Sequence, residues 1–203
     1  PLSSLDYQLR KEMQLELKAL QKALKMTFVF VTHDQEEALS MSDRIVIFNQ
    51  GNIEQIGTPR EVYETPKNLF VGNFIGEANI FDIEVLETSE DKIKVNLEDT
   101  SLFCVNNLNL KPKQKAHLLI RPEDIKVWGL NEVENSAHMI SGRIIDIIYK
   151  GSTVDVKVQL PSGREIYASE FFDEDDDTLI YTLDEKVWVH WLTGWEVLLH
   201  YEK

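Results

Sequence analysis

The chain has 203 residues, of which 21 are Lys or Arg and 35 are Asp or Glu, so its formal net charge is −14. Hydrophobic residues make up 43% and charged residues 28%, which excludes a disordered or fibrous protein and supplies enough apolar material for a core. The acidic balance argues against a nucleic-acid partner, because phosphate contacts require Lys and Arg. The length by itself predicts one or two domains.

The acidic charge is concentrated in the C-terminal part of the chain. Residues 1–76 contain 8 basic and 10 acidic residues, whereas residues 77–203 contain 13 and 25, a net charge of −12. Cys104 is the only cysteine, which excludes an internal disulfide and favours a reducing compartment. The longest stretch without Asp, Glu, Lys or Arg is eleven residues, Thr100 to Leu110, and a spanning helix needs roughly 20. The start at Pro1, without an initiator Met, leads us to expect a longer parent protein.

The N-terminal part shows alternating helix and strand patterns. Residues 6–25 are predicted to form a helix, with Asp6 as its N-cap or as an acid of its first turn. Its apolar positions make one stripe: Leu9, Met13, Leu17, Leu20 and Leu24. The β-branched and aromatic run Thr27–Thr32 predicts a strand that is buried on both faces. Asp34 is a suitable N-cap for a short helix over 35–39.

A hairpin and a second helix start follow. Residues 44–48 read as a strand in which four apolar residues follow Arg44, and residues 49–52 form a turn signal. Residues 53–56 alternate in polarity, which predicts a half-exposed hairpin partner. Thr58, Pro59 and Glu61 combine an N-cap, a proline at the first helical position and a capping-box glutamate. This order of elements places residues 1–66 in an α/β unit.

From about residue 77 the chain consists of short strand-like segments separated by turn signals, which predicts a small all-β barrel or sandwich. We therefore place the domain boundary near residue 77 and expect domains at 1–76 and 77–203. The predicted strands are Ile80–Leu86, Ile93–Leu97, Ser101–Val105, Ala116–Ile120, Ile125–Trp128, Ile140–Tyr149, Thr153–Leu160, Glu165–Ala168, Lys186–Leu192 and Glu196–Tyr201.

His33 is the first candidate functional residue. It follows the predicted strand and precedes a helix, which is where open α/β sheets place ligands and where helix N–H groups favour phosphate. A structural histidine that is hydrogen-bonded at a strand end is the alternative.

The segments around His33 carry a specific resemblance. Leu2-Ser3-Ser4-Leu5-Asp6 before a helix, and Val31-Thr32-His33-Asp34-Gln35-Glu36-Glu37-Ala38 after the predicted strand, resemble the C-terminal part of an ABC-transporter ATPase domain. The resemblance implies that His33 is the switch histidine that contacts the γ-phosphate. It also implies that Ser3, Ser4, Leu5 and Asp6 form the D-loop at the interface of two ATPase domains, although the alternative for these residues is plain helix capping.

Other segments of that family are absent from the sequence. None of the nine glycines lies in a Gly-x-x-x-x-Gly-Lys-[Ser/Thr] loop, and the signature motif, Q-loop and Walker B strand are missing too. We therefore expect that this chain alone neither binds ATP well nor hydrolyses it, whereas the resemblance implies ATP and Mg²⁺ as cofactors of the intact protein.

Segments in the C-terminal part of the chain indicate a more specific group within this family. Leu118-Leu119-Ile120-Arg121-Pro122-Glu123-Asp124-Ile125 and Tyr149-Lys150-Gly151-Ser152-Thr153-Val154 resemble the two halves of a TOBE domain, the OB-type extension of importer ATPases. Residues 70–77 and 169–176 are similar to the ATP-binding subunits of bacterial spermidine/putrescine importers. The resemblance implies an ATPase homodimer on the cytoplasmic face of the inner membrane, with two permease subunits and, indirectly, a periplasmic polyamine-binding protein. As an isolated chain it is expected to be soluble.

An acidic segment admits two interpretations. Six carboxylates fall within eight residues: Glu170, Asp173, Glu174, Asp175, Asp176 and Asp177. A solvated loop is the simpler interpretation. The sharper hypothesis is that the loop attracts polyamine cations and senses them. No metal site is predicted, because the spacing and the glycine of an EF-hand loop are absent.

Two further features are interpreted as structural. The alternation in 187–191 predicts that Val187, Val189 and Trp191 share one face, so tryptophan packing is favoured over a base-stacking platform. Arg121 with Glu123 and Asp124 is interpreted as a salt-bridged turn. The rival to the importer ATPase is a stand-alone TOBE-type regulatory or small-ligand-binding module without ATPase activity.

Overall fold

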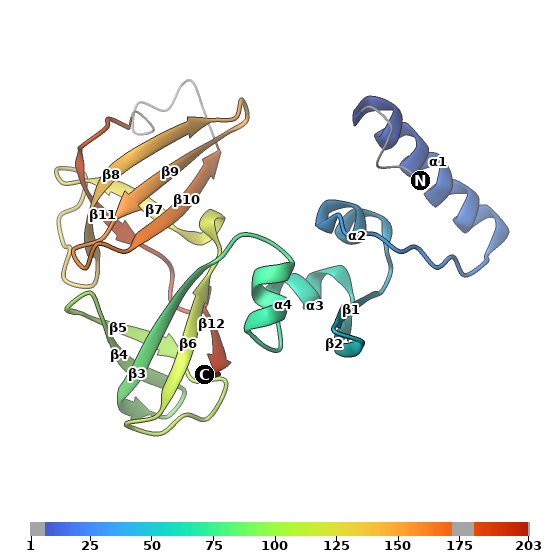
Figure 1. Cartoon of the computed structure of the whole chain (residues 1–203). Coiled ribbons are helices and arrows are strands. Elements are labelled where there is room, and N and C mark those ends of the chain that lie inside the picture. Colours follow the sequence, from blue (N-terminus) through green and yellow to red (C-terminus); the bar gives the residue numbers. More distant parts are fainter. Residues whose placement is uncertain (1–6, 172–180, 203) are drawn as a thin grey trace.

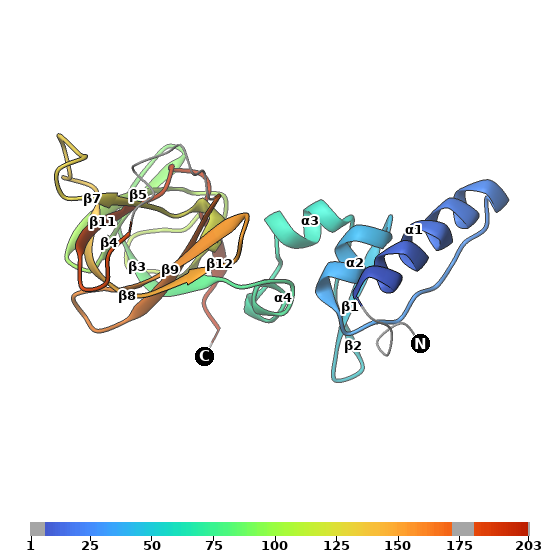
Figure 2. The same ribbon diagram turned by 90° about the horizontal axis from the view of Figure 1, so that it is seen from above.

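The computed structural model describes residues 7–171 and 181–202, and these form an elongated molecule (Figure 1). Helix α1 lies at one end and the two β-sheets at the other, with short helices and a hairpin between them (Figure 2). Two separate groups of buried side chains are present. The larger lies within the sheets between Phe81 and Leu198, and the smaller lies among the short elements between Ile45 and Ile75.

Helix α1 (Tyr7–Leu24) forms where the 3.6-residue periodicity predicts a helix. Its predicted cap, Asp6, lies outside the described residues. The apolar stripe does not face a core, since Leu9, Leu20 and Leu24 are exposed. The helix instead lies on α2 (Gln35–Met41) with a polar face, so its packing within this chain relies on hydrogen bonds and ion pairs.

The predicted buried strand at Thr27–Thr32 is wrong for this structure. Residues 26–32 have no regular secondary structure, and Val29 and Val31 are 88% and 86% exposed. A β-branched run has a high strand propensity, but it needs neighbouring strands to satisfy its backbone groups and side chains to cover its faces. The part of the chain that the structure describes brings neither to this segment.

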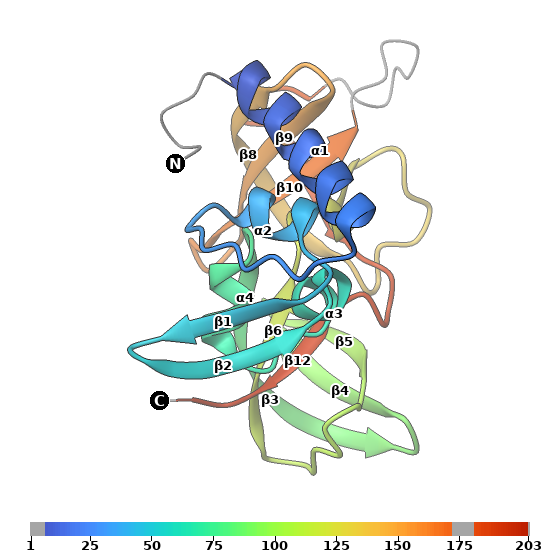
Figure 3. The same cartoon turned by 90° about the vertical axis from the view of Figure 1, so that its right-hand side faces the viewer.

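The hairpin and the helix start are confirmed. Strands β1 (Ile45–Asn49) and β2 (Asn52–Gly57) pair antiparallel, and Figure 3 shows the hairpin beside α3 and α4. Helix α3 (Pro59–Glu64) has the predicted capping box: the Thr58 side chain accepts from the Glu61 N–H, and the Glu61 carboxylate accepts from the Thr58 N–H at 2.8 Å. Helix α4 (Leu69–Phe74) follows. One face of the hairpin packs on these helices through Ile45, Ile47, Val62, Val71 and Ile75.

All ten strands that the sequence predicts beyond residue 77 are present. Their bounds are β3 (Asn79–Ser89), β4 (Lys92–Leu97), β5 (Thr100–Val105), β6 (Lys115–Ile120), β7 (Lys126–Gly129), β8 (Ile140–Tyr149), β9 (Thr153–Gln159), β10 (Glu165–Phe171), β11 (Lys186–His190) and β12 (Val197–His200), with a 3₁₀ turn η1 (Pro122–Asp124) between β6 and β7. As predicted, Val187, Val189 and Trp191 are buried together, while Trp188 faces the other side.

The strands form two five-stranded antiparallel sheets with the same internal order. One sheet is β12-β6-β3-β4-β5 and the other is β7-β11-β8-β9-β10. The first half of this region contains β3 to β7 and the second half contains β8 to β12. In each half the first three strands form a meander, and the fourth strand pairs with the first strand of that meander. The fifth strand of each half, β7 or β12, instead pairs at the edge of the other half's sheet, and this exchange joins both sheets around one core.

Two buried glutamates bridge the edges of these sheets. Glu170 on the edge strand β10 accepts a hydrogen bond from the Val127 N–H of the opposite edge strand β7, at 3.1 Å. Glu196, just before β12, accepts from the Val105 N–H at the end of β5, the opposite edge of the other sheet, at 3.0 Å. Each carboxylate thus satisfies a backbone donor that a neighbouring strand would otherwise bind.

The position of Glu170 corrects its assignment to an acidic loop. Its side chain is buried in a strand and bound to the backbone of β7 and to Lys126 Nζ at 3.4 Å. The alternation of β10 places it on the core face with Ile166 and Ala168, because residues two apart share a face. Glu170 is therefore a structural residue of the sheets.

Candidate functional site

His33 lies in a bend immediately before α2, and hydrogen bonds between its neighbours fix this bend. Asp34 is the N-cap, and its Oδ1 accepts from the Glu37 N–H at 3.1 Å. The Thr32 hydroxyl accepts from the Asp34 N–H at 2.9 Å and donates to Glu37 Oε2 at 2.7 Å. These contacts bracket His33 on both sides in the chain, so its backbone is held although its side chain is exposed.

The predicted N-cap at Asp34 is confirmed, but the predicted strand before His33 is not formed. Within residues 7–171 and 181–202, the His33 side chain makes no hydrogen bond, so the alternative of a hydrogen-bonded structural histidine has no support there. An exposed imidazole on a fixed turn is free to donate a hydrogen bond to an incoming ligand.

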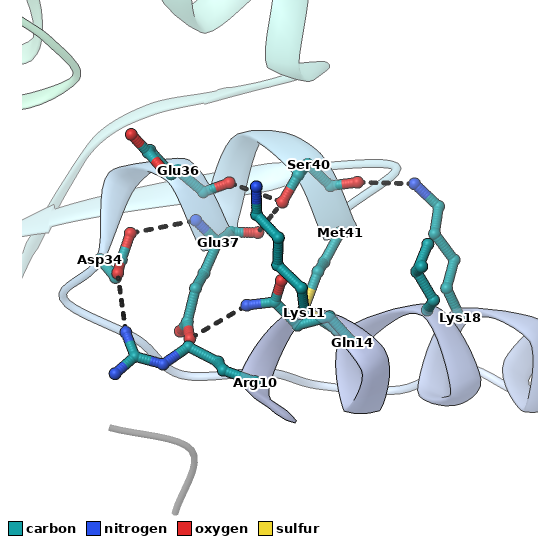
Figure 4. A pocket seen from close by; sticks show the side chains of 10 residues that line it. Arg10, Lys11, Gln14, Lys18, Asp34, Glu36, Glu37, Ser40 and Met41 are labelled. Carbon is teal, nitrogen blue, oxygen red and sulfur yellow. Dashed lines mark hydrogen bonds and ion pairs between the residues drawn. The ribbon is translucent and has the colours of Figure 1, made fainter. Parts of the chain in front are cut away.

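Helix α1 meets α2 through polar side chains three and four residues apart on one face (Figure 4). Arg10 Nη1 lies 3.8 Å from Asp34 Oδ2, Gln14 Nε2 donates to Glu37 Oε1 at 3.2 Å, and Lys18 Nζ donates to the Ser40 carbonyl at 2.6 Å. The two oxygens of the Glu37 carboxylate therefore accept hydrogen bonds from different segments: Oε2 from Thr32, just before His33, and Oε1 from Gln14 of α1.

A cavity of about 360 Å³ opens between these two helices, and His33 is not among the residues that line it. The lining mixes both signs of charge: Arg10, Lys11, Lys18, Asp34, Glu36 and Glu37. Because the cationic and anionic groups lie together, the cavity selects neither an anion nor a cation. We interpret it as the interface between α1 and α2 and not as a nucleotide site.

The remaining predicted site residues lie outside the described residues. Ser3, Ser4, Leu5 and Asp6 of the predicted D-loop belong to this group, and so do five members of the acidic segment: Asp173, Glu174, Asp175, Asp176 and Asp177. Glu170, which the structure does describe, is the buried residue assigned above to the sheets.

A second, smaller cavity lies between the sheets. Its volume is about 160 Å³, and its lining residues are Leu102, Phe103, His138, His190, Trp191 and Thr193. Burial lowers the pKa of His190, and the nearby His138 lowers it further, which favours a neutral imidazole. The described residues contain no group of three or more His, Cys, Asp and Glu side chains that could hold a metal ion.

Arg121 does not form the predicted salt-bridged turn. In the part of the chain that the structure describes, it makes no ion pair with Glu123 or Asp124. Its buried guanidinium instead donates to backbone carbonyls of α3, α4 and the following segment. The sequence interpretation was correct in giving Arg121 a structural role and wrong about its partners, which lie more than 40 residues away in the sequence.

No helix among residues 7–171 and 181–202 has the length and hydropathy to cross a membrane. Residues 118–199, which span most of the strand-exchanged sheets, match the family described as the TOBE domain. The part of the chain that is similar to a TOBE domain follows the segment with the hairpin and the short helices.

Comparison with curated proteins extends the match to the whole chain. It is 67% identical over 202 residues to the spermidine/putrescine import ATP-binding protein PotA of Legionella pneumophila (strain Philadelphia 1), covering 100% of this chain and 56% of that protein. It is 51% identical over 199 residues to PotA of Escherichia coli (strain K12), covering 98% of this chain and 52% of that protein. These matches fit the C-terminal portion of this family of import ATP-binding proteins, and the chain spans about half the length of the relatives it matches.

Among solved structures, the cytoplasmic molybdate-binding protein ModG with molybdate bound is similar to part of the chain. The TM-score is 0.49 at 16% sequence identity, and the match covers 59% of this chain and 94% of that one.

Proposed function

We propose that this chain is the C-terminal portion of the ATP-hydrolysing subunit of an ABC importer for polyamines. The observation that carries the proposal is the 67% identity along the full length of the chain to a spermidine/putrescine import ATP-binding protein. In this proposal residues 1–76 are the end of an ATPase domain, and residues 77–203 are its TOBE domain. ATP hydrolysis on the cytoplasmic face of the inner membrane would energise uptake through two permease subunits fed by a periplasmic binding protein.

His33 is the residue of this chain to which we assign a role in hydrolysis. Its exposed side chain projects from a turn that Asp34, Thr32 and Glu37 hold in place. A neutral imidazole there would donate one N–H to the γ-phosphate and stabilise the charge that develops during phosphoryl transfer. Because these hydrogen bonds come from the chain itself, they would hold the His33 backbone in place for a phosphate.

The chain alone does not fit ATP and Mg²⁺. Its sequence has no glycine-rich phosphate loop with a lysine, and the described cavity next to α2 has charges of both signs. We therefore propose that the residues that hold the nucleotide and Mg²⁺ belong to other parts of the intact subunit, and that the 203-residue chain hydrolyses no ATP. The dimer that would complete the site, with the D-loop Ser3, Ser4, Leu5 and Asp6 at its interface, is part of the same proposal.

Exposed apolar side chains support the view that residues 26–56 belong to a larger α/β domain. Val29 and Val31 are almost fully exposed, and the outer face of the β1–β2 hairpin presents Val46, Phe48 and Ile53 to solvent. Uncovered apolar surface of this kind marks an interface. In the intact subunit we propose that the rest of the ATPase sheet pairs with residues 27–32 and covers these side chains.

The rival function is a stand-alone TOBE-type regulatory or ligand-binding module. It is favoured by the larger core, which is built only from residues between Phe81 and Leu198 and needs nothing from residues 1–76. The acidic residues Asp173 to Asp177 would serve either function as a polyamine-attracting segment, a proposal that rests on charge density alone. Titrating spermidine at low and high salt tests it: replacement of these acids by Ser should remove a salt-sensitive binding step.

Polyamine uptake separates the two functions. The intact gene product would be expressed with its permease subunits in cells that lack their own polyamine importer, and uptake of labelled spermidine would be measured. We expect uptake with the wild-type protein and with His200→Ala, a matched change of an exposed histidine on β12, and loss of uptake with His33→Ala. Uptake that is unaffected by His33→Ala would contradict the proposal and favour the module.

A further inference from the structure

Arg121 lies at the junction between the two parts of the molecule. It follows the last residue of β6 and precedes η1, where the chain leaves one sheet to supply strand β7 to the other. Its side chain is only 4% exposed, although it carries a full positive charge. A buried guanidinium is costly unless its donors are satisfied, so the groups that receive these donors indicate its role.

The guanidinium binds the C-terminal ends of two helices at once. Nη1 donates to the carbonyls of Gly72, Gly76 and Glu77 at 2.9, 3.0 and 3.0 Å, and Nη2 donates to the Tyr63 carbonyl at 3.2 Å. Carbonyls at a helix C-terminus lack partners within the helix and carry its negative dipole end. One side chain of the sheet unit therefore satisfies acceptors of both α3 and α4.

The ring of Tyr63 completes the contact from the helix side. The Arg121 Cζ lies 4.4 Å from the centre of this ring, within the range of a cation–π interaction. The Tyr63 hydroxyl donates to the Glu123 carboxylate in η1. Burial raises the pKa of Tyr63, and this hydrogen bond raises it further. Tyr63 also packs against the smaller core, so it connects that core to the sheets.

Apolar packing supports the same junction. Leu119 and Leu199 are buried but lie outside the larger core, because they face the opposite side of their sheet from Leu118 and Leu198. Helix α4 packs on these two leucines at Gly72. The approach is so close that a methyl group added at Gly72 would lie 2.5 Å from Leu119 Cδ1 and 3.8 Å from Leu199 Cδ1. Glycine is thus required for the close approach of α4 to the sheet.

The burial of Arg121 is favourable only while the helices are docked. Within the described residues its guanidinium makes no ion pair with a carboxylate, and its Nε has no hydrogen-bond partner. The four backbone carbonyls and the Tyr63 ring therefore offset most of the free-energy cost of burying this charge. If α3 and α4 moved away, the guanidinium would lose its acceptors together, which makes docking cooperative.

We propose that Arg121 is a latch that fixes α3 and α4 to the sheets, so that the hairpin, these helices and the sheets move as one body. The smaller core connects α3 and α4 to α2 through Ala38 and Leu39, and the N-terminus of α2 follows His33. A movement of the TOBE domain would in this way reach the turn that holds His33. In this proposal the parts that move separately are divided by a boundary N-terminal to α2 and not by one at residue 77.

Hydrogen exchange of the 203-residue chain tests the latch. Arg121→Lys keeps the charge but replaces a planar fork of donors by a single ammonium, which cannot reach four carbonyls. We expect amides of residues 69–77 to exchange roughly 10- to 100-fold faster, with β3 to β12 unchanged. The control is Arg164→Lys, because Arg164 also donates to one carbonyl, that of Ile80, and lies over a ring, that of Phe81, but is exposed and outside the junction.

Two results would overturn the proposal. One is unchanged exchange of residues 69–77 in Arg121→Lys, and the other is an equal acceleration in all the strands, which would give Arg121 a role only within the sheets. Tyr63→Leu provides an independent variant in case Arg121→Lys does not fold, because it removes the ring from the helix side. It should accelerate the same residues, and normal exchange there in a folded Tyr63→Leu chain would also refute the latch.

Discussion

Replacement of Glu170 by Ala should destabilise the sheets because it removes the only carboxylate that the structure places on the Val127 N–H. Val127 is buried, so this donor would lose the acceptor that the folded chain provides. An unsatisfied buried donor costs about 1–3 kcal/mol. For a folding unit of this size, a loss of about 2 kcal/mol lowers the Tm by roughly 5–10 °C.

Glu170→Gln separates the hydrogen bond from the charge. The amide oxygen can still accept from Val127, whereas the ion pair with Lys126 and its hydrogen bond to Oε2 are lost. Because the Lys126 side chain is 44% exposed, solvent screens this ion pair and its loss costs less than about 1 kcal/mol. The predicted order of stability is therefore wild type, then Glu170→Gln, then Glu170→Ala.

Urea unfolding followed by tryptophan fluorescence measures this order, since Trp128, Trp188, Trp191 and Trp195 all lie in the sheet unit. Glu165→Ala is the matched control: Glu165 lies on the same strand with a half-exposed side chain that pairs with Lys157. If Glu170→Ala were as stable as Glu170→Gln, the carboxylate would not be needed as an acceptor and the edge-bridging role would be wrong.

The close packing of α4, the burial of Cys104 and the capping box of α3 can each be tested separately. Gly72→Ala should undock α4, because the new methyl group would collide with Leu119, and trypsin should then cut near Lys67 faster than in the wild-type chain. Burial raises the pKa of the Cys104 thiol, so a thiol reagent at pH 8 should label it only after unfolding, and stoichiometric labelling of the folded chain would contradict its burial. The hydrogen bonds from the Thr58 backbone and side chain lower the pKa of Glu61 below its ordinary value of 4.5. This contribution to stability is complete above pH 4.5 and is lost as the pH falls through the lower folded-state pKa, so protection of α3 amides should decline in acid. Thr58→Ala should reduce that decline without abolishing it, because it removes the side-chain hydrogen bond and keeps the one from the backbone N–H.

The strand-rich half of the fold could be predicted because its signals are local. Alternation and turn residues identify each strand from β3 to β12, and the capping box identifies the start of α3. The exchange of β7 and β12 between the sheets could not be predicted in this way. Alternation says which face of a strand is buried but does not name the partner strand.

The structure changes the assignments of two residues, Glu170 and Arg121, for different physical reasons. Glu170 was read as part of a charge run, although its spacing from Ile166 and Ala168 places it on the buried face of the strand, so a signal was present. The partners of Arg121 had no such signal, because they are backbone carbonyls of distant helices. The strand predicted at 27–32 failed because its residues have the propensity for a strand but no neighbours to pair with in the described part of the chain.

The most direct test of the proposed function is ATP hydrolysis by the intact subunit that contains this chain. We predict turnover by the wild-type protein and by His200→Ala, a fall of at least about 100-fold in His33→Ala, and no turnover by the 203-residue chain alone. Near-normal turnover in His33→Ala, with the fold intact by circular dichroism, would contradict the assignment of His33 and with it the account of residues 1–76 as part of an ATPase site.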